Sequence, residues 1–338
     1  MNLKKALICG AGGFIGHHLV NKYKAEGFWV RGVDIKNPEY SSSKADEFIL
    51  ADLRFPEEAK RALEGGPFDE VCQLAANMGG MGFISTHDAE IMHDSALINL
   101  NVLEECRKAK AKKILYTSSA CIYPEYNQLD PNNSKCPENS AYPANPDTEY
   151  GWEKLFSERL YKAYAKDYSM DTRVVRLHNI FGPEGTWKGG REKAPAAICR
   201  KIAEADDRDI IEIWGKGDQT RSFLYIDECI EAIWRVMQAD PGLPILNIGS
   251  EENISINNLA LLIAKIANKK ISIRNGSGYE GVRGRNSDNT LIQTTLHWAP
   301  NQTLEAGLKK LYPWIEQRVR LFAIATKLIK PKKTSRVN

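Results

Sequence analysis

The sequence predicts an α/β fold, a Rossmann-type doubly wound parallel sheet with a smaller α+β C-terminal lobe. Three observations support this prediction. Short apolar runs alternate with helical patterns through the first half, glycines follow the first run, and the pattern changes after about residue 182. We therefore expect a nucleotide-binding domain over 1–182, a mainly substrate-binding lobe over 183–317, and a basic, flexible tail over 318–338.

The expected strands of the first domain are apolar runs of four or five residues, which is the length of buried strands in parallel sheets. They cover residues 6–9, 29–33, 47–50, 70–74, 113–117 and 172–176. The helices between them are longer patterns, over 15–26, 96–108 and 150–168, the last opening at Asp147 as its N-cap.

The second part is rich in Gly and Lys loops. It contains expected strands at 210–214 and 244–248 and expected helices at 226–238 and 255–267, the second opened by Ser255. No linker-like stretch precedes it, so we expect it to pack on the first domain rather than form a separate unit.

Composition limits the class of protein. The chain has 338 residues, 43% apolar and 26% charged, which suits a globular fold, and no apolar run approaches the roughly 18 residues that span a bilayer. Its start indicates a buried strand rather than a secretory signal. The seven cysteines lack CxxC spacing, which predicts free thiols in the cytoplasm and no metal site.

The net charge of +3 is concentrated at the end, where residues 318–338 hold seven basic residues and no acid. Such a tail could touch a membrane surface or nucleic acid, but a solvated, partly disordered tail is the commoner explanation of such a charge run. We therefore predict no nucleic-acid partner and no membrane partner, with weak surface contact of the tail left open.

A glycine-rich turn predicts the cofactor. The segment from Gly10 to Gly16 joins a strand to a helix, where glycines let the backbone approach a pyrophosphate. Asp34 ends the second strand; its carboxylate would accept hydrogen bonds from ribose hydroxyls and repel a 2′-phosphate, which favours NAD over NADP. The expected cofactor contacts are Gly10, Gly12, Gly13, Phe14, Ile15, Gly16, Asp34, Asp52, Leu53, Leu74, Ala75 and Ala76, with Asp52 near the adenine.

Tyr150 and Lys154 lie four residues apart on an expected helix and so share one face. A phenol is a weak base at neutral pH, and a neighbouring ammonium is expected to lower its pKa and to hold the nicotinamide ribose. Ser119, at the end of an expected strand, can hydrogen-bond the same substrate oxygen. Together the three predict oxidation of a sugar hydroxyl, with Tyr150 and Lys154 also contacting the cofactor.

Longer stretches carry a resemblance. They are residues 74–83, 118–124, 178–183, 185–196, 219–223 and 280–289. Over nearly all of residues 4–315 the chain resembles the extended short-chain dehydrogenase/reductases of the NAD-dependent epimerase/dehydratase family, and among them most the GDP-mannose 3,5-epimerases. One departure is Asn77, where that family is expected to have Asp.

The resemblance implies a reaction. Tyr150 deprotonates the hydroxyl at carbon 4 while a tightly bound NAD takes the hydride, and the ketone then acidifies the protons at carbons 5 and 3. Cys121 and Lys193 match the family's acid/base pair. Return of the hydride would convert GDP-D-mannose to GDP-L-galactose, and possibly GDP-L-gulose, without consuming NAD.

The resemblance also implies a substrate site. Arg221 and Arg283 match diphosphate clamps, and Asn179 would approach the diphosphate or the sugar. The loop of Gly79, Gly80 and Met81 would lie close to the hexose. Weaker candidates for the nucleotide surroundings are Lys188, Lys201, Trp214 and Gln219, beside the acid/base residue Lys193, with Arg285 and Asp288 shaping the pocket.

Alternatives remain at this point. A GDP-fucose-synthase-type epimerase/reductase shares the thiol and the Tyr/Lys pair but would use NADPH and a histidine in place of Lys193. A 3,5-epimerase of another GDP-sugar, such as a GDP-heptose or a 4-keto-6-deoxy sugar, would use the same site. A non-catalytic NAD-binding regulator is a third reading. The resemblance further implies a homodimer formed through the helices at 96–108 and 150–168.

Overall fold

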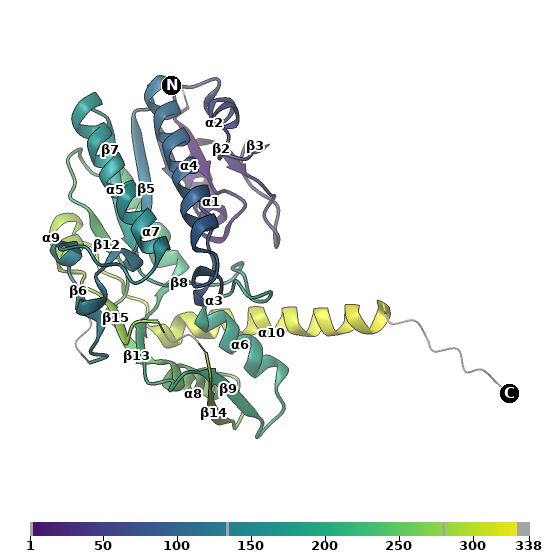
Figure 1. Ribbon diagram of the computed structural model, residues 1–338. Coiled ribbons are helices and arrows are strands. Elements are labelled where there is room, and N and C mark those ends of the chain that lie inside the picture. Colours follow the sequence, from purple (N-terminus) through teal and green to yellow (C-terminus); the bar gives the residue numbers. More distant parts are fainter. Residues whose placement is uncertain (1–2, 133–134, 279–280, 330–338) are drawn as a thin grey trace.

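The computed structural model describes residues 3–132, 135–278 and 281–329 (Figure 1). A seven-stranded sheet of strand order β12-β7-β5-β4-β1-β2-β3 forms the centre of the larger part, and its neighbouring strands all pair in parallel. The predicted doubly wound parallel sheet is confirmed. Its strands are β1 (Lys5–Cys9), β2 (Trp29–Asp34), β3 (Glu47–Leu50), β4 (Glu70–Gln73), β5 (Lys113–Ser119), β7 (Asp171–Leu177) and β12 (Leu246–Ile248).

Alternate residues of β1 serve two different cores. Ala6 and Ile8 belong to the core that includes α1 (Phe14–Ala25) and α7 (Ile226–Gln238). Leu7 and Cys9 belong to the core that includes α4 (Asp88–Lys108) and α2 (Pro56–Leu63). Because successive side chains of a strand point to opposite faces, helices cover both faces of the sheet and the strands read as unbroken apolar runs.

Two helix boundaries differ from the prediction. α5 (Glu149–Tyr168) takes Thr148 as its N-cap, whose hydroxyl accepts a hydrogen bond from Gly151 N, whereas Asp147 pairs with Arg285. α4 begins at Asp88, eight residues before the expected start, because Ile91 is buried in its first turns.

The smaller part is built from short elements after residue 177, together with one strand from the first half. Its strands are β6 (Lys135–Cys136), β8 (Ile180–Phe181), β9 (Ile210–Trp214), β10 (Thr220–Ser222), β11 (Leu224–Tyr225), β13 (Asn253–Ser255), β14 (Ser272–Gly276) and β15 (Gly284–Ser287). Its helices are α6 (Ala194–Glu204), α8 (Ile256–Ile266), α9 (Thr290–Leu296) and α10 (Leu304–Ile329), while α3 (Met81–Ile84) and the 3₁₀ turns η1 (Ala120–Ile122), η2 (Glu125–Gln128) and η3 (Glu138–Ala141) line the junction.

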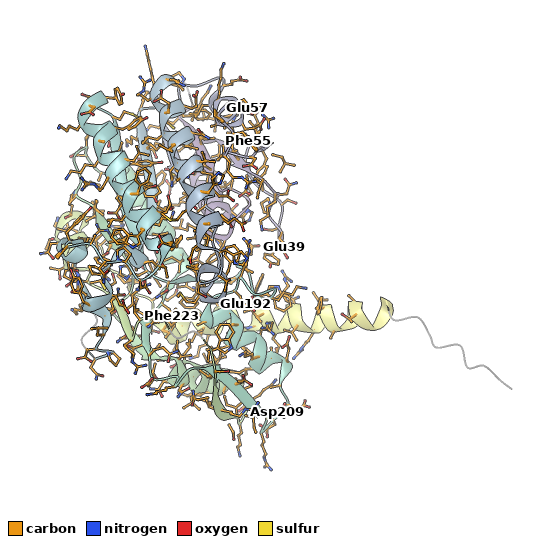
Figure 2. The ribbon with its side chains drawn as sticks, viewed as in Figure 1. Glu39, Phe55, Glu57, Glu192, Asp209 and Phe223 are labelled. Atoms are coloured by element: carbon orange, nitrogen blue, oxygen red, sulfur yellow. The ribbon has the colours of Figure 1, made fainter. Side chains whose placement is uncertain are left out.

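The strand expected at 244–248 is β12, which joins the large sheet beside β7. The chain therefore leaves the large sheet after β7 and returns to it through α7 and β12, so the two parts are interleaved around residues 226–248. Figure 2 shows Glu192 and Phe223 where the two parts meet, and Asp209 at the far end of the smaller one.

The end of the chain differs from the flexible tail expected from 318. α10 continues to Ile329 and extends away from the body (Figure 1). Arg318 lies over the rings of Tyr40 and Trp314, and Arg320 pairs with Glu316, so local contacts support the helix past its buried half. The expected tail over 330–338 lies outside the described residues. None of the described helices is both long and apolar enough to cross a membrane.

Candidate active site

The glycine-rich turn lies between β1 and α1 with little room for side chains. Gly10 has φ +84°, and a Cβ there would lie 2.8 Å from Ala75 N. Cβ atoms at Gly12 and Gly16 would lie 2.1 Å from Lys36 O and 2.0 Å from Gly10 O. α1 starts after Gly13 without a side-chain cap, which leaves its first N–H groups to bind a phosphate. The cradle fits a dinucleotide.

Asp34 ends β2 beside this turn. Its Oδ2 accepts a hydrogen bond from Gly12 N at 2.9 Å and its Oδ1 accepts one from Lys36 N at 3.2 Å, while burial raises the pKa of the carboxyl. The pocket next to it is lined by Gly12, Gly13, Phe14, His17, Lys36 and Glu184, among others. This side of the turn therefore suits the adenosine ribose.

Asp52 and Leu53 follow β3 at the same edge of the sheet. Arg54 forks onto Asp52 with its Nη2 at 2.7 Å, which lowers the pKa of Asp52, and also reaches Asp94 at 2.9 Å. Leu53 is buried. Leu74, Ala75 and Ala76 follow β4, and a Cβ at Gly10 of the turn would lie against Ala75. Contact of these residues with a cofactor stays a prediction.

Ser119, Tyr150 and Lys154 meet where β5 ends and α5 begins. Burial raises the pKa of Tyr150, the neighbouring Cys121 adds to this, and a hydrogen bond with Ser119 opposes it. Lys154 Nζ donates to Thr117 O at 3.1 Å and lies 5.7 Å from the Tyr150 ring centre, with its own pKa lowered by burial. The expected lowering of the Tyr150 pKa by Lys154 is thus not seen: burial dominates, and Ser119 supplies the opposing effect.

Cys121 lies in η1, directly after the strand that carries Ser119, and its N–H donates to Ser119 Oγ at 3.2 Å. Gly151 packs so closely that a Cβ there would lie 2.2 Å from Cys121 O. Lys193, the N-cap residue of α6, is half-buried; burial lowers its pKa while Cys121 raises it. The thiol, the amine and the phenol form one electrostatically coupled cluster.

The loop before α3 supports Lys193. Gly80 N donates to Arg191 O at 2.9 Å, and a Cβ at Gly80 would lie 2.4 Å from Glu192 O. A Cβ at Gly79 would lie 2.9 Å from the side chain of Phe83. Gly80 thus lets this loop approach the backbone just before Lys193, and Met81 follows as the first residue of α3.

The hydrogen bonds of Asn77 explain why an amide stands where the family pattern predicts Asp. Its Nδ2 donates to Glu90 Oε1 at 3.0 Å and Asp94 Oδ2 at 3.2 Å, and its Oδ1 accepts from Arg191 at 3.4 Å. A carboxylate there would face two other carboxylates, whereas an amide can donate to both.

The candidate phosphate ligands lie on the smaller part. Arg221 donates to Thr220 O at 2.7 Å and Val282 O at 2.8 Å, and burial, reinforced by Arg285, lowers its pKa to about 10. Arg283 forks onto Asp218 at 2.7 and 3.0 Å.

Most of the remaining substrate candidates lie around β9 and β10, and Lys188 lies elsewhere. Lys201 donates to Glu212 O at 2.7 Å, Gln219 to Trp214 O at 3.4 Å, and Asn179 to Ser222 O at 3.0 Å, which places these around β9 and β10. Lys188 lies instead over the Phe322 ring of α10, 3.6 Å from its centre.

Arg285 is the residue whose role the sequence left vague. It contacts Cys121, 164 positions earlier in the chain, together with Asp147 and Gln128. No spacing rule connects residues so far apart. Its place within the 280–289 stretch was the signal that could have singled it out.

Fold and site together define a nucleotide-binding short-chain dehydrogenase-type protein, in which a strand-turn-helix cradle faces a Ser/Tyr/Lys unit. More particularly, the chain belongs to the NAD dependent epimerase/dehydratase family, whose model matches residues 6–249. Among its relatives is the GDP-mannose 3,5-epimerase of Arabidopsis thaliana, 47% identical over 317 residues that cover 93% of this chain and 83% of the relative.

More distant proteins share less of the sequence. GDP-L-fucose synthase of Escherichia coli is 27% identical over 258 residues, covering 73% of this chain and 79% of the relative. The crystal structure of UDP-glucose 4-epimerase from Thermotoga maritima with UDP-glucose superposes with a TM-score of 0.80 at 23% identity, covering 93% of this chain and 99% of that one. At that identity the likeness shows the fold.

Proposed function

We propose that the protein is an NAD-dependent 3,5-epimerase that converts GDP-D-mannose to GDP-L-galactose, with GDP-L-gulose as a further product. The observation that carries the proposal is the grouping of Cys121 and Lys193 with Tyr150 at one site, in a chain 47% identical to a GDP-mannose 3,5-epimerase. A hydride-transfer unit alone would serve a simple oxidation. An added acid/base pair is what inversion at carbon requires.

In this mechanism Tyr150 removes the proton of the carbon-4 hydroxyl, while Ser119 holds that oxygen by a hydrogen bond. A bound NAD, held by the glycine turn and Asp34, would supply reversible hydride transfer at carbon 4. Cys121 and Lys193 then exchange protons at carbons 5 and 3, because the ketone at carbon 4 delocalises the charge left at either centre. Tyr150 finally protonates the oxygen again, so the net reaction is an epimerisation.

Arg221 and Arg283 supply positive charge for the substrate diphosphate. Arg221 is the better placed of the two relative to the sugar site, because it interacts electrostatically with Cys121 and Arg285. The loop of Gly79, Gly80 and Met81 borders the sugar, with Asn179 near the diphosphate. Trp214, Gln219 and Lys201 surround the nucleotide, and Lys193 faces the sugar. Lys188 has a weaker claim, because its ammonium lies over Phe322.

The cofactor in this proposal is a tightly held NAD rather than NADP. Asp34 supports it, since a buried carboxylate at the end of β2 would repel a 2′-phosphate. We place the protein in the cytoplasm, because its seven cysteines are free thiols, which suits a reducing compartment.

Incubation with GDP-mannose in D₂O tests the function. We expect deuterium at carbons 5 and 3 without net formation of NADH. Cys121→Ala should abolish the exchange, while Cys199→Ala, a thiol buried in the core, should retain it. No exchange with the unaltered enzyme would refute GDP-mannose as substrate, and exchange with another GDP-sugar alone would reassign it. Consumption of NADPH would point to the reductase alternative, which Lys193 and Asp34 oppose.

We further propose a homodimer formed through α4 and α5. These helices pack on each other and expose Leu100, Trp152 and Phe156, large apolar side chains between 39% and 49% exposed. Trp152 and Phe156 lie on one face of α5, since they are four residues apart. Sedimentation should show a dimer that Phe156→Glu converts to a monomer. A monomer before substitution would refute it.

A further inference from the structure

A buried arginine of the smaller part lies against the Cys121 sulfur. Arg285, on β15, is 5% exposed, and its Nη1 donates a hydrogen bond to Cys121 Sγ at 3.0 Å. A thiol sulfur is a weak acceptor, whereas a thiolate is a charged one. A guanidinium at this distance therefore bonds more strongly to an ionised sulfur than to a neutral one.

The orientation of Arg285 is fixed on two further sides. Nη2 donates to Asp147 Oδ1 at 3.1 Å, and Nε donates to Gln128 Oε1. Gln128 is itself held, because its Nε2 donates to Tyr123 O at 2.9 Å and Pro124 O at 3.0 Å. Turning the guanidinium away from Cys121 would break bonds to η2 and to the residue before the N-cap of α5.

The charges around the sulfur agree with this arrangement. Burial opposes the charge of Arg285, but Cys121 and Asp147 outweigh it, so the pKa of Arg285 is raised above its usual value. On the other sides, Lys193 of α6, Lys154 of α5 and Arg221 of β10 interact electrostatically with Cys121. The Tyr150 phenol also lies beside Cys121, and its raised pKa favours its neutral form. The sulfur therefore lies among basic side chains, and Asp147 pairs with the nearest of them, Arg285.

We propose that Arg285 is a positioning residue for Cys121, holding its sulfur as a thiolate aimed at the sugar site. The inference rests on the acid/base role of Cys121 in the proposed function. In the step it serves, the carbon–hydrogen bond breaks, its proton passes to sulfur and its electron pair enters the enolate. Arg285 releases no proton in this step.

Alkylation by iodoacetamide tests this without substrate. Cys121 is the half-buried thiol, and the other six cysteines are buried, so the modified peptide identifies Cys121. We expect Arg285→Met to lower the alkylation rate at pH 7 about tenfold and to move the rate-against-pH midpoint up by about one unit. Arg285→Lys should fall between, because it keeps a charge but loses the fork.

Arg31→Met is the matched control, a buried arginine distant from this cluster that pairs with Glu47. It should lower stability without changing the alkylation midpoint. If Arg285→Met does not fold, the Lys variant carries the test. An unchanged midpoint and rate in a folded Arg285 variant would overturn the proposal.

A second measurement separates this inference from the proposed function. With GDP-mannose in D₂O, Arg285→Met should lose deuterium exchange at least about tenfold while still forming NADH transiently from substrate. If alkylation shifts as expected but Cys121→Ala keeps full exchange, the acid/base role fails and the Arg285–Cys121 coupling stands. If alkylation is unchanged while Cys121→Ala abolishes exchange, the function stands and Arg285 has no such role.

Discussion

At the scale of the residue, the site contains ionisable groups whose charged forms are disfavoured by burial. Tyr150 and Lys154 are both buried, and burial moves their pKa values away from the charged forms. Burial therefore favours the neutral phenol of Tyr150 and makes the amine of Lys154 less basic. A bound dinucleotide and the substrate oxygen would supply the interactions that bring the proton transfer within reach.

We expect Tyr150→Phe to lower turnover about 10²- to 10⁴-fold, because the group that we propose as acceptor of the carbon-4 proton is lost. Tyr161→Phe is a matched control on the same helix, since its buried hydroxyl lacks a hydrogen-bond partner among the described residues. Initial rates with circular dichroism of each variant check this. Equal losses in both variants would show a structural cause.

His178 gives the fold a dependence on pH. Burial lowers its pKa from 6.5 to about 3, with Asn247 opposing through a hydrogen bond. Between pH 6.5 and 3 the unfolded chain therefore binds a proton at His178 that the folded chain does not bind. The free energy of unfolding falls over this range by about 1.4 kcal/mol per pH unit as the pH decreases.

Urea unfolding between pH 7 and 4 measures this. His178→Gln should be less stable at pH 7 but lose stability more slowly on acidification. His93→Gln, at an exposed side chain, should keep the slope of the unaltered protein. The same slope in the His178 variant would contradict the assignment.

At the scale of the element, loops rather than strands position Cys121 and Lys193, the proposed acid/base pair. Lys193 is the residue before the first turn of α6, and the 79–81 loop packs against Arg191 and Glu192 just before it. Cys121 lies in a 3₁₀ turn fastened to the start of α5 through Gly151. Each group thus comes from a different element, and small shifts of either loop would separate them.

Gly80→Ala should lower turnover about 10- to 100-fold, because a displacement near 1 Å at a reacting group has that effect. The new Cβ would lie 2.4 Å from Glu192 O, so the backbone before Lys193 must move. Gly185→Ala is the control, since its nearest contact would be an ordinary 3.5 Å. Steady-state rates and melting temperatures compare the two. Equal rates would show that the 79–81 loop does not position Lys193.

At the scale of the whole molecule, α10 has two halves with different roles. Leu304, Leu308, Leu311, Tyr312 and Ile315 are buried in the main core, whereas residues 320–326 are exposed. Removing five such side chains from the core would cost on the order of 10 kcal/mol, which is comparable to the stability of a typical domain.

A chain ending after Arg320 should therefore keep its melting temperature to within about 2 °C and keep its activity. A chain ending after Thr303 should fail to fold. Scanning calorimetry and circular dichroism check both. A large loss of stability in the longer chain would show that the projecting half of α10 is structurally required.

Most elements of the larger part could be predicted, because each of its strands and helices is recognisable from a short stretch of sequence. The strands β1 to β5 and β7 were each predicted from a short run of mainly apolar residues, and alternation with helices leaves a parallel sheet as the way to bury both faces. The interleaving by β12 was missed, since Leu246–Ile248 has the same appearance in either sheet and its partner is β7, some 70 residues earlier.

The chemistry-bearing residues followed from the sequence for a similar reason. The glycine turn, Asp34, and the Tyr150/Lys154 spacing each lie within one strand-turn-helix or one helix, where geometry follows from residue count. The amino-acid order thus sufficed to predict the fold class, a dinucleotide cofactor and the residues of the proposed hydride-transfer unit.

Contacts between distant segments needed the folded molecule. The meeting of Arg285 with Cys121, the closure of the 79–81 loop on the backbone before Lys193, and the raised pKa of Tyr150 all arise from packing between elements far apart in the chain. Burial and long-range charge depend on how elements assemble, and no local pattern encodes them. The surroundings of the Cys121 thiol were therefore decided by the tertiary structure.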